Sequence, residues 1–289
     1  MSTPVKNLPT WGFISLLTNC VLLLAAFLLI WRQQELASVL ATITYPEPAN
    51  LNLDKQTFTP ELGPRHKLNY KQWLEILQKE AKAVAENSPQ QLTILAGDSL
   101  SLWFPSQLLP ENRTWLNQAI SGETSKGLLK RLDLFDRTKP EMVLVMVGIN
   151  DLIRGVSDQE IINNHQQIIR YLREKHPQSQ IFVQSILPHG GEDTTWEGRK
   201  KLLAIPNSRI LNLNQELQKI ATAQNVVYLN LYPLFTNSQG NLHQTLTTDG
   251  LHLSPQGYVV WRTALQIYTS KKLVPPSENQ ENNYRQDRI

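Results

Sequence analysis

The chain has 289 residues, of which 41% are hydrophobic and 18% charged, with 28 basic against 25 acidic side chains. This composition is typical of a protein with a substantial core, and it excludes a chain that is disordered throughout. The longest basic run, Arg199-Lys200-Lys201, is short and lacks interleaved aromatic residues, so no nucleic-acid-binding surface is predicted. The single cysteine, Cys20, excludes an intrachain disulfide and a cysteine-rich metal site.

Residues 11–31, which follow a short N-terminal segment (1–10), predict one transmembrane helix. The stretch from Trp11 to Trp31 contains no charged residue and has a tryptophan at each end. As a helix it spans about 31 Å, the thickness of a bilayer core. A cleaved signal peptide is the main alternative, but the apolar region is longer than a usual signal core. The weak positive-inside bias favours an inside N-terminus and places the rest of the chain on the extracytoplasmic side.

The predicted transmembrane helix is followed by a linker and then by an amphipathic helix. Residues 32–66 contain four prolines in a polar stretch and predict an extended linker. Within residues 67–87, apolar side chains recur every three or four positions and predict a helix that packs on the following domain. These side chains are Tyr70, Leu74, Leu77, Ala81 and Val84. At the other end, residues 271–289 are polar after Pro275-Pro276 and predict a disordered tail.

Residues 88–270 alternate between short apolar runs and helical patterns, which predicts repeated strand-helix units and an α/β layered domain. The predicted strands are 92–96, 115–120 (the weakest), 142–147, 181–186 and 226–229. The predicted helices are 101–109, 125–135, 158–175, 208–224 and 254–270. The central runs are apolar on both faces, as in parallel strands that are covered by helices on each side.

Chemically informative residues follow three of the predicted strands. Ser99, in Gly97-Asp98-Ser99-Leu100, follows the first strand and is the candidate nucleophile. Gly122 follows the second strand, where a glycine lets a backbone N–H approach a ligand. Asn150 follows the third strand and can point its amide at a developing negative charge. Each has an ordinary alternative as a helix cap or a turn residue.

A second pair of candidates lies just before the last predicted helix, in Asp249-Gly250-Leu251-His252. Ser254-Pro255 supplies an N-cap and a first helical position directly after it. An aspartate and a histidine three residues apart on a loop can both face one serine. The residues at the strand ends and before this helix therefore predict a single polar site at one edge of the sheet.

This ordered set resembles the SGNH, or GDSL, hydrolase family, over about residues 92–270. The resemblance implies a three-layer α/β sandwich with a mainly parallel five-stranded sheet, similar to flavodoxin. It implies a catalytic triad of Ser99, His252 and Asp249. It also implies an oxyanion hole that is formed by the backbone N–H groups of Ser99 and Gly122 and the side chain of Asn150.

The resulting hypothesis is a membrane-anchored serine esterase that works through an acyl-enzyme. Its partner is an ester on a small molecule, lipid or glycan, or a thioester, and no nucleic acid. Two alternatives remain: an O-acyltransferase that acts on envelope polysaccharide, and a catalytically silent, membrane-anchored binding module. Asp98 and Asp151 are alternative acids, although each lies beside another motif residue and fits a turn or cap role better.

The sequence leaves the acyl group and the oligomeric state open. Trp103, just after the nucleophile, and Trp196, in the loop 188–206, either line an acyl pocket or serve in packing. We expect no cofactor and no metal, because the remaining histidines show no metal-ligand spacing. These histidines are His66, His165, His176 and His243.

Overall fold

The computed structural model describes residues 68–271. The predicted transmembrane helix 11–31, the linker 32–66 and the tail beyond residue 271 lie outside the described residues. Within residues 68–271, no helix has both the length and the apolar character that crossing a bilayer requires.

The described residues form a five-stranded sheet in the order β2-β1-β3-β4-β5, and each pair of neighbours is parallel. The strands are β1 (Leu92–Gly97), β2 (Thr114–Asn117), β3 (Met142–Met146), β4 (Gln180–Gln184) and β5 (Val227–Leu229). The predicted α/β fold with a parallel sheet is confirmed. The chain reverses its direction of winding between β1 and β3, and such a switch point is where open α/β sheets bind ligands.

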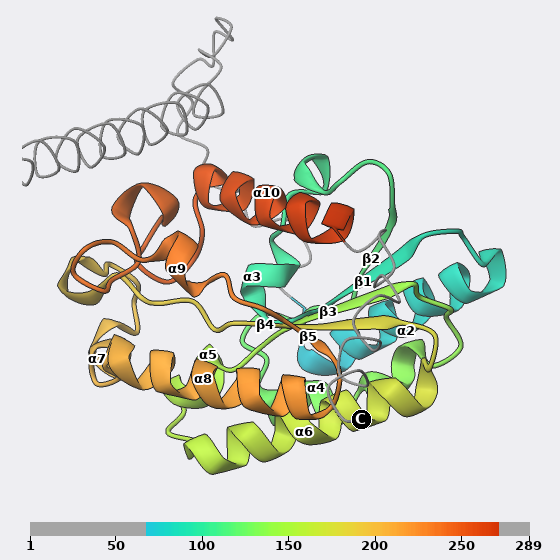
Figure 1. Ribbon diagram of the computed structural model, residues 1–289, viewed down its shortest axis with the longest axis horizontal. Coiled ribbons are helices and arrows are strands. Elements are labelled where there is room, and N and C mark those ends of the chain that lie inside the picture. Colours follow the sequence, from blue (N-terminus) through green and yellow to red (C-terminus); the bar gives the residue numbers. More distant parts are fainter. Residues whose placement is uncertain (1–67, 272–289) are drawn as a thin grey trace, which may run out of the picture. The chain divides into compact units, whose positions relative to one another are not determined.

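Helices cover both faces of this sheet, as Figure 1 shows. Along β3, Met142, Leu144 and Met146 belong to a core shared with α3, α9 and α10. Val143 and Val145 belong to a core on the other face, shared with α2, α4 and α6. The helices are α2 (Tyr70–Asn87), α3 (Ser99–Leu102), α4 (Ser125–Leu129), α5 (Ile149–Ile153), α6 (Asp158–Lys175), α7 (Arg199–Leu203), α8 (Asn207–Ala223), α9 (Tyr232–Phe235) and α10 (Pro255–Lys271). Alternate side chains on one strand thus build both cores.

Helix α2 packs against the sheet unit through a face slightly rotated from the predicted one. Trp73, Leu77 and Ala81 are buried, whereas Tyr70 is 48% exposed. Asn69 caps the helix by accepting a hydrogen bond from the backbone N–H of Gln72, 3.0 Å away. The helix therefore belongs to the same compact unit as the sheet.

The predicted helix 101–109 is wrong in both its start and its end. Helix α3 begins at Ser99, because Asp98 is its N-cap, and it ends at Leu102. Pro105 disfavours helical geometry at the preceding residue, and only a short 3₁₀ turn, η2 (Ser106–Leu108), follows. As a result the predicted nucleophile stands on the first residue of a helix and not in a turn before it.

Other differences arise where polar side chains take over backbone hydrogen bonds. Strand β2 ends at Asn117, whose side chain accepts a hydrogen bond from the Ala119 N–H at 3.0 Å. Strand β4 ends before Ile186, whose N–H donates to Asn214 at 2.8 Å. The predicted helix 125–135 is divided into α4 and the 3₁₀ helix η3 (Leu132–Phe135). The division falls at Arg131, whose side chain turns inward.

Candidate active site

The candidate site begins where β1 and β3 end side by side. Gly97 lies opposite Met146 in the parallel register. A Cβ atom on Gly97 would lie 2.1 Å from the carbonyl oxygen of Met146, so only glycine allows the two strand ends to approach this closely. Ser99 follows β1 by two residues, and Asn150 follows β3 by four. The pairing therefore brings the predicted nucleophile and the predicted amide donor to one edge of the sheet.

Ser99 is held on the first turn of α3. The carboxylate of Asp98 accepts a hydrogen bond from the Leu100 N–H at 3.1 Å. The Ser99 carbonyl accepts one from the Trp103 N–H at 3.0 Å. Ser99 is 6% exposed. The N-capped helical turn and the almost complete burial of Ser99 thus fix its position.

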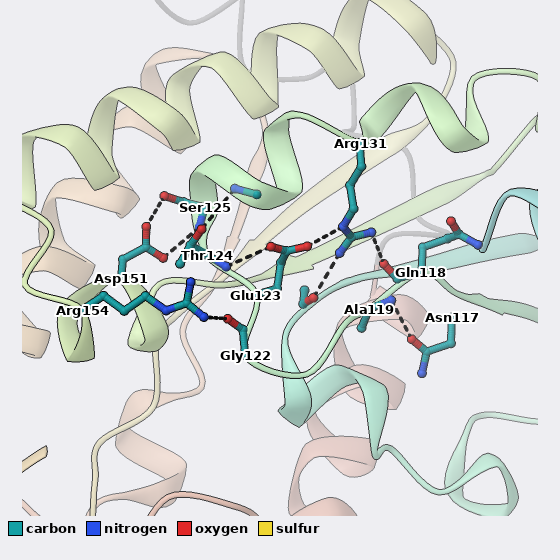
Figure 2. A network of polar contacts seen from close by, with 12 residues as sticks. Asn117, Gln118, Ala119, Gly122, Glu123, Thr124, Ser125, Arg131, Asp151 and Arg154 are labelled. Atoms are coloured by element: carbon teal, nitrogen blue, oxygen red, sulfur yellow. Dashed lines mark hydrogen bonds and ion pairs between the residues drawn. The ribbon is translucent and has the colours of Figure 1, made fainter. Parts of the chain in front are cut away.

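The segment after β2 runs along β1 and carries Gly122 to the same edge. The Ile120 N–H donates to the Gly97 carbonyl at 3.1 Å, two residues before Gly122. Gly122 has a φ of +74°, which side-chain-bearing residues rarely adopt. Its carbonyl accepts a hydrogen bond from the Arg154 guanidinium at 2.7 Å (Figure 2). The Arg154 side chain therefore holds the carbonyl of this glycine turn in place.

Asn150 and Asp151 are adjacent on α5 but have different surroundings. Asn150 Nδ2 is buried and has no hydrogen-bond partner among residues 68–271. Asp151 is fully buried, and its carboxylate accepts hydrogen bonds from the Ser125 N–H at 2.8 Å and the Ser125 hydroxyl at 2.6 Å (Figure 2). The hydrogen bonds of Asp151 thus hold the loop after Gly122, whereas the Asn150 amide has a donor that no described residue accepts.

Asp249 and His252 form a hydrogen-bonded pair on the loop before α10. Asp249 Oδ2 lies 2.7 Å from His252 Nδ1. Asp249 Oδ1 accepts the backbone N–H groups of Leu251 and His252 at 2.9 and 2.8 Å. Burial alone would raise the pKa of Asp249, but hydrogen bonds and the charge of His252, with the Leu251 N–H, outweigh it and hold the pKa below its usual value. Asp249 is therefore an ionised partner for the imidazole.

The His252 ring is placed against the helix that carries Ser99. Its centroid lies 4.3 Å from that of Trp103, at an interplanar angle of 40°. The Tyr258 hydroxyl on α10 donates to the Leu100 carbonyl on α3 at 3.0 Å. Trp103, predicted to serve an acyl pocket or packing, thus packs on the imidazole and on the neighbouring core.

The loop after β4 donates backbone hydrogen bonds to the loop that carries Asp249. The Asp249 carbonyl accepts the N–H groups of Thr195 and Trp196, both at 2.9 Å. The Gly190 N–H donates to the Gly250 carbonyl at 2.7 Å. The Trp196 side chain is partly buried against the core around α8. These contacts tie the Asp249 loop to the sheet unit.

The structure brings Ser99, Gly122, Asn150, Asp249 and His252 to the carboxyl edge of the sheet. It also adds residues that the sequence analysis missed: Glu123, Arg131 and Arg154, which hold the segment after β2 (Figure 2). The sequence does contain one indication that Arg131 is buried, because this charged residue lies between Leu128-Leu129 and Leu132 in an apolar helical stretch. Within the part of the chain that the structure describes, no group of histidine, cysteine and acidic residues is arranged to hold a metal ion.

Comparisons with known proteins agree with this geometry. A model of the GDSL-like Lipase/Acylhydrolase family matches residues 70–260. A solved structure from Streptococcus pneumonia, described as a platelet activating factor, is 28% identical with a TM-score of 0.62 and covers 68% of this chain and 93% of that chain. Platelet-activating factor acetylhydrolase IB subunit alpha2 of Gallus gallus is 27% identical over 177 residues, which are 57% of this chain and 70% of the relative.

A further relative is the N-acylneuraminate cytidylyltransferase of Streptococcus agalactiae serotype V, which is 23% identical over 196 residues. The match covers 68% of this chain and 44% of the relative, so the chain spans less than half the length of that relative. The family model, in contrast, extends from α2 into α10 and includes all the strands. The chain belongs to the GDSL-like lipase/acylhydrolase family.

Proposed function

We propose that the chain is a serine esterase with Ser99 as nucleophile, His252 as base and Asp249 as the orienting acid. The observation that supports this most directly is the Asp249–His252 hydrogen bond of 2.7 Å, on an imidazole packed against Trp103, the residue that follows the helix of Ser99. Because Asp249 occupies Nδ1, the other ring nitrogen, Nε2, is left to accept a proton.

The reaction follows from these positions. The Ser99 hydroxyl oxygen attacks the ester carbonyl carbon while His252 Nε2 accepts its proton. The tetrahedral intermediate collapses to an acyl-enzyme, and the departing alcohol takes the proton from His252. A water molecule then attacks the acyl-enzyme with His252 again as base, which releases the acid and restores Ser99.

The negative oxygen of the tetrahedral intermediate needs donors that are in place beforehand. We assign these to the backbone N–H groups of Ser99 and Gly122 and to Asn150 Nδ2. The buried Asn150 donor without a partner supports this assignment, because a substrate oxygen would complete its hydrogen bonding. The glycine conformation at Gly122 supports it as well, since it leaves the approach to the backbone free of a side chain.

Contacts distinguish Asp249 from the two other candidate acids. Asp151 is engaged by Ser125, and Asp98 caps α3. Complete burial, with the nearby charges of Asp151 and Glu123, raises the pKa of Asp98 to about 7, although its backbone hydrogen bonds act in the opposite direction. A carboxyl group that holds its proton near neutral pH is a poor partner for an imidazolium ion, which further favours Asp249.

For the substrate, we propose a carboxylic ester with a short acyl group, with acetyl esters as the first class to test. The relative from Gallus gallus is by its name an acetylhydrolase, which supports this choice. Transfer of the acyl group to a sugar hydroxyl instead of water is the alternative outcome.

Replacement of Ser99 by alanine is expected to abolish hydrolysis of p-nitrophenyl acetate and labelling by a fluorophosphonate probe, because both need the hydroxyl nucleophile. Ser101→Ala is the matched control. Ser101 is a buried serine in the same helix, and its hydroxyl has no hydrogen-bond partner among the described residues. It should retain activity. Full turnover by the Ser99→Ala protein would refute the proposed nucleophile, and an unlabelled wild type would favour the silent binding module.

Replacement of Asn150 by alanine is expected to lower kcat by about 10²- to 10³-fold, the usual effect of losing one oxyanion donor. The melting temperature should hardly change, because Asn150 Nδ2 makes no hydrogen bond within residues 68–271. Asn163→Ala, an exposed asparagine on α6, serves as the control for both measurements. An unchanged kcat in Asn150→Ala would remove this residue from the oxyanion hole.

Replacement of Asp98 by asparagine is expected to stabilise the protein increasingly as pH rises from about 4 to 7, and by a constant amount above that. The folded pKa of Asp98 is raised to about 7, whereas the unfolded chain ionises near the ordinary aspartate pKa of about 3.9. Between these values only the unfolded wild type releases the proton, so the wild type loses stability as pH rises. Urea unfolding of both proteins across this range provides the measurement, and a pH-independent difference would contradict the raised pKa.

We also propose that residues 11–31 anchor the enzyme, with the hydrolase unit on the extracytoplasmic side. The uncharged stretch between Trp11 and Trp31 supports this. The full chain should remain in the membrane pellet after an alkaline carbonate wash. A Leu23→Arg/Leu24→Arg variant should be released, because charges at the centre of a span are costly. Release of the wild type would contradict the anchor.

A further inference from the structure

A buried ion pair joins Glu123, the residue after Gly122, to Arg131 (Figure 2). Arg131 Nε donates to Glu123 Oε2 at 2.6 Å, and the two side chains are only 2% and 4% exposed. Removing both charges from water is costly, and apolar residues of similar volume often serve stability equally well. The pair therefore calls for a role other than stability.

The rest of the Arg131 guanidinium binds the ends of two strands. Nη1 donates to the Gln118 carbonyl at 2.6 Å, just after β2. Nη2 lies 3.4 Å from the Gly97 carbonyl, the last residue of β1 and two residues before Ser99. One planar group thus joins β1, the extension of β2 and the residue that follows Gly122.

The Glu123 carboxylate is held equally firmly. It accepts a hydrogen bond from the Thr124 N–H at 3.2 Å and one from the Tyr70 hydroxyl on α2. Gly127 provides its space, because a Cβ atom there would lie 1.9 Å from Glu123 Oε1. None of these partners comes from the loop that carries Asp249 and His252.

We propose that Glu123 and Arg131 are positioning residues for the oxyanion hole: together they set the Gly122 N–H relative to the Ser99 N–H. This inference rests on the proposed function, in which these two groups bind the same oxygen. Such donors must lie 2.7 to 3.1 Å from the oxyanion, in a geometry that exists before the reaction begins. A guanidinium that is bonded to both backbone segments supplies that geometry.

The test is Arg131→Lys, which keeps the buried positive charge for Glu123 but lacks the fork that reaches several acceptors. The activity is divided by the amount of protein whose Ser99 reacts to completion with the fluorophosphonate probe. A loss of folded protein therefore does not lower the measured kcat. For p-nitrophenyl acetate we expect kcat to fall at least about tenfold and KM to change less than about twofold. Inhibition by a trifluoromethyl ketone, which forms an oxyanion on Ser99, should weaken by the same factor as kcat/KM.

Arg113→Lys is the matched control. Arg113 is also a largely buried arginine paired with a glutamate, Glu141, at 2.9 Å, but it binds Thr93 near the start of β1, at the opposite end of the strand. Its kcat should match the wild type. An equal loss of kcat in both variants would assign the effect to general weakening of the fold and would overturn the inference.

If Arg131→Lys does not fold, the same measurements on Gly127→Ala test the inference. This variant keeps both charges, but its added methyl group displaces the Glu123 carboxylate. A drop in kcat with the same loss of inhibitor affinity supports the inference. Native kcat in the folded variant overturns it, while inactivity of Ser99→Ala in the same assay still upholds the proposed function. Activity of Ser99→Ala would instead overturn the proposed function itself.

Discussion

The close approach of β1 and β3 at Gly97 is the contact on which the other features of the site depend. There is no room for a side chain between Gly97 and the Met146 carbonyl. The Gly97 carbonyl in turn accepts the Ile120 N–H and faces Arg131. The end of β1 is therefore joined to β3 on one side and to the extension of β2 on the other. Any group that separated the strands here would move the serine, the asparagine and the glycine turn relative to one another.

The apolar cores and the polar carboxyl edge of the sheet are stabilised by different kinds of interaction. The sheet and its helices are held by interchangeable apolar contacts, and many residues share that burial. At the carboxyl edge, by contrast, buried polar groups have specific partners: Asp151 has Ser125, Glu123 has Arg131, and Asp249 has His252. Such networks tolerate little change, since each lost partner leaves a buried polar atom unsatisfied. The Asn150 amide departs from this pattern in a way that suits a transient ligand.

The parallel sheet and the placement of the candidate residues at its carboxyl edge could be predicted from sequence, because both depend on local patterns. Apolar runs such as Met142–Met146 indicate strands, and short motifs at strand ends indicate where chemistry occurs. The start of α3 was misplaced because Asp98 has two uses, as a turn residue and as a helix cap. The Glu123–Arg131 pair was missed because its importance depends on the contacts with Gly97 and Gln118. Those contacts arise only when β1 and β2 are side by side.

The contact between Tyr258 and the Leu100 carbonyl has a consequence for the order in which the candidate site is assembled during synthesis. The serine follows the first strand, whereas the histidine follows the last, and β2 to β5 lie between them. A chain emerging from the ribosome therefore holds Ser99, the proposed nucleophile, long before α10 can bring the proposed base, His252, against α3. A partly made chain carries Ser99 without His252. Under the proposed function, hydrolytic activity is therefore acquired in one late step, when α10 packs against α3.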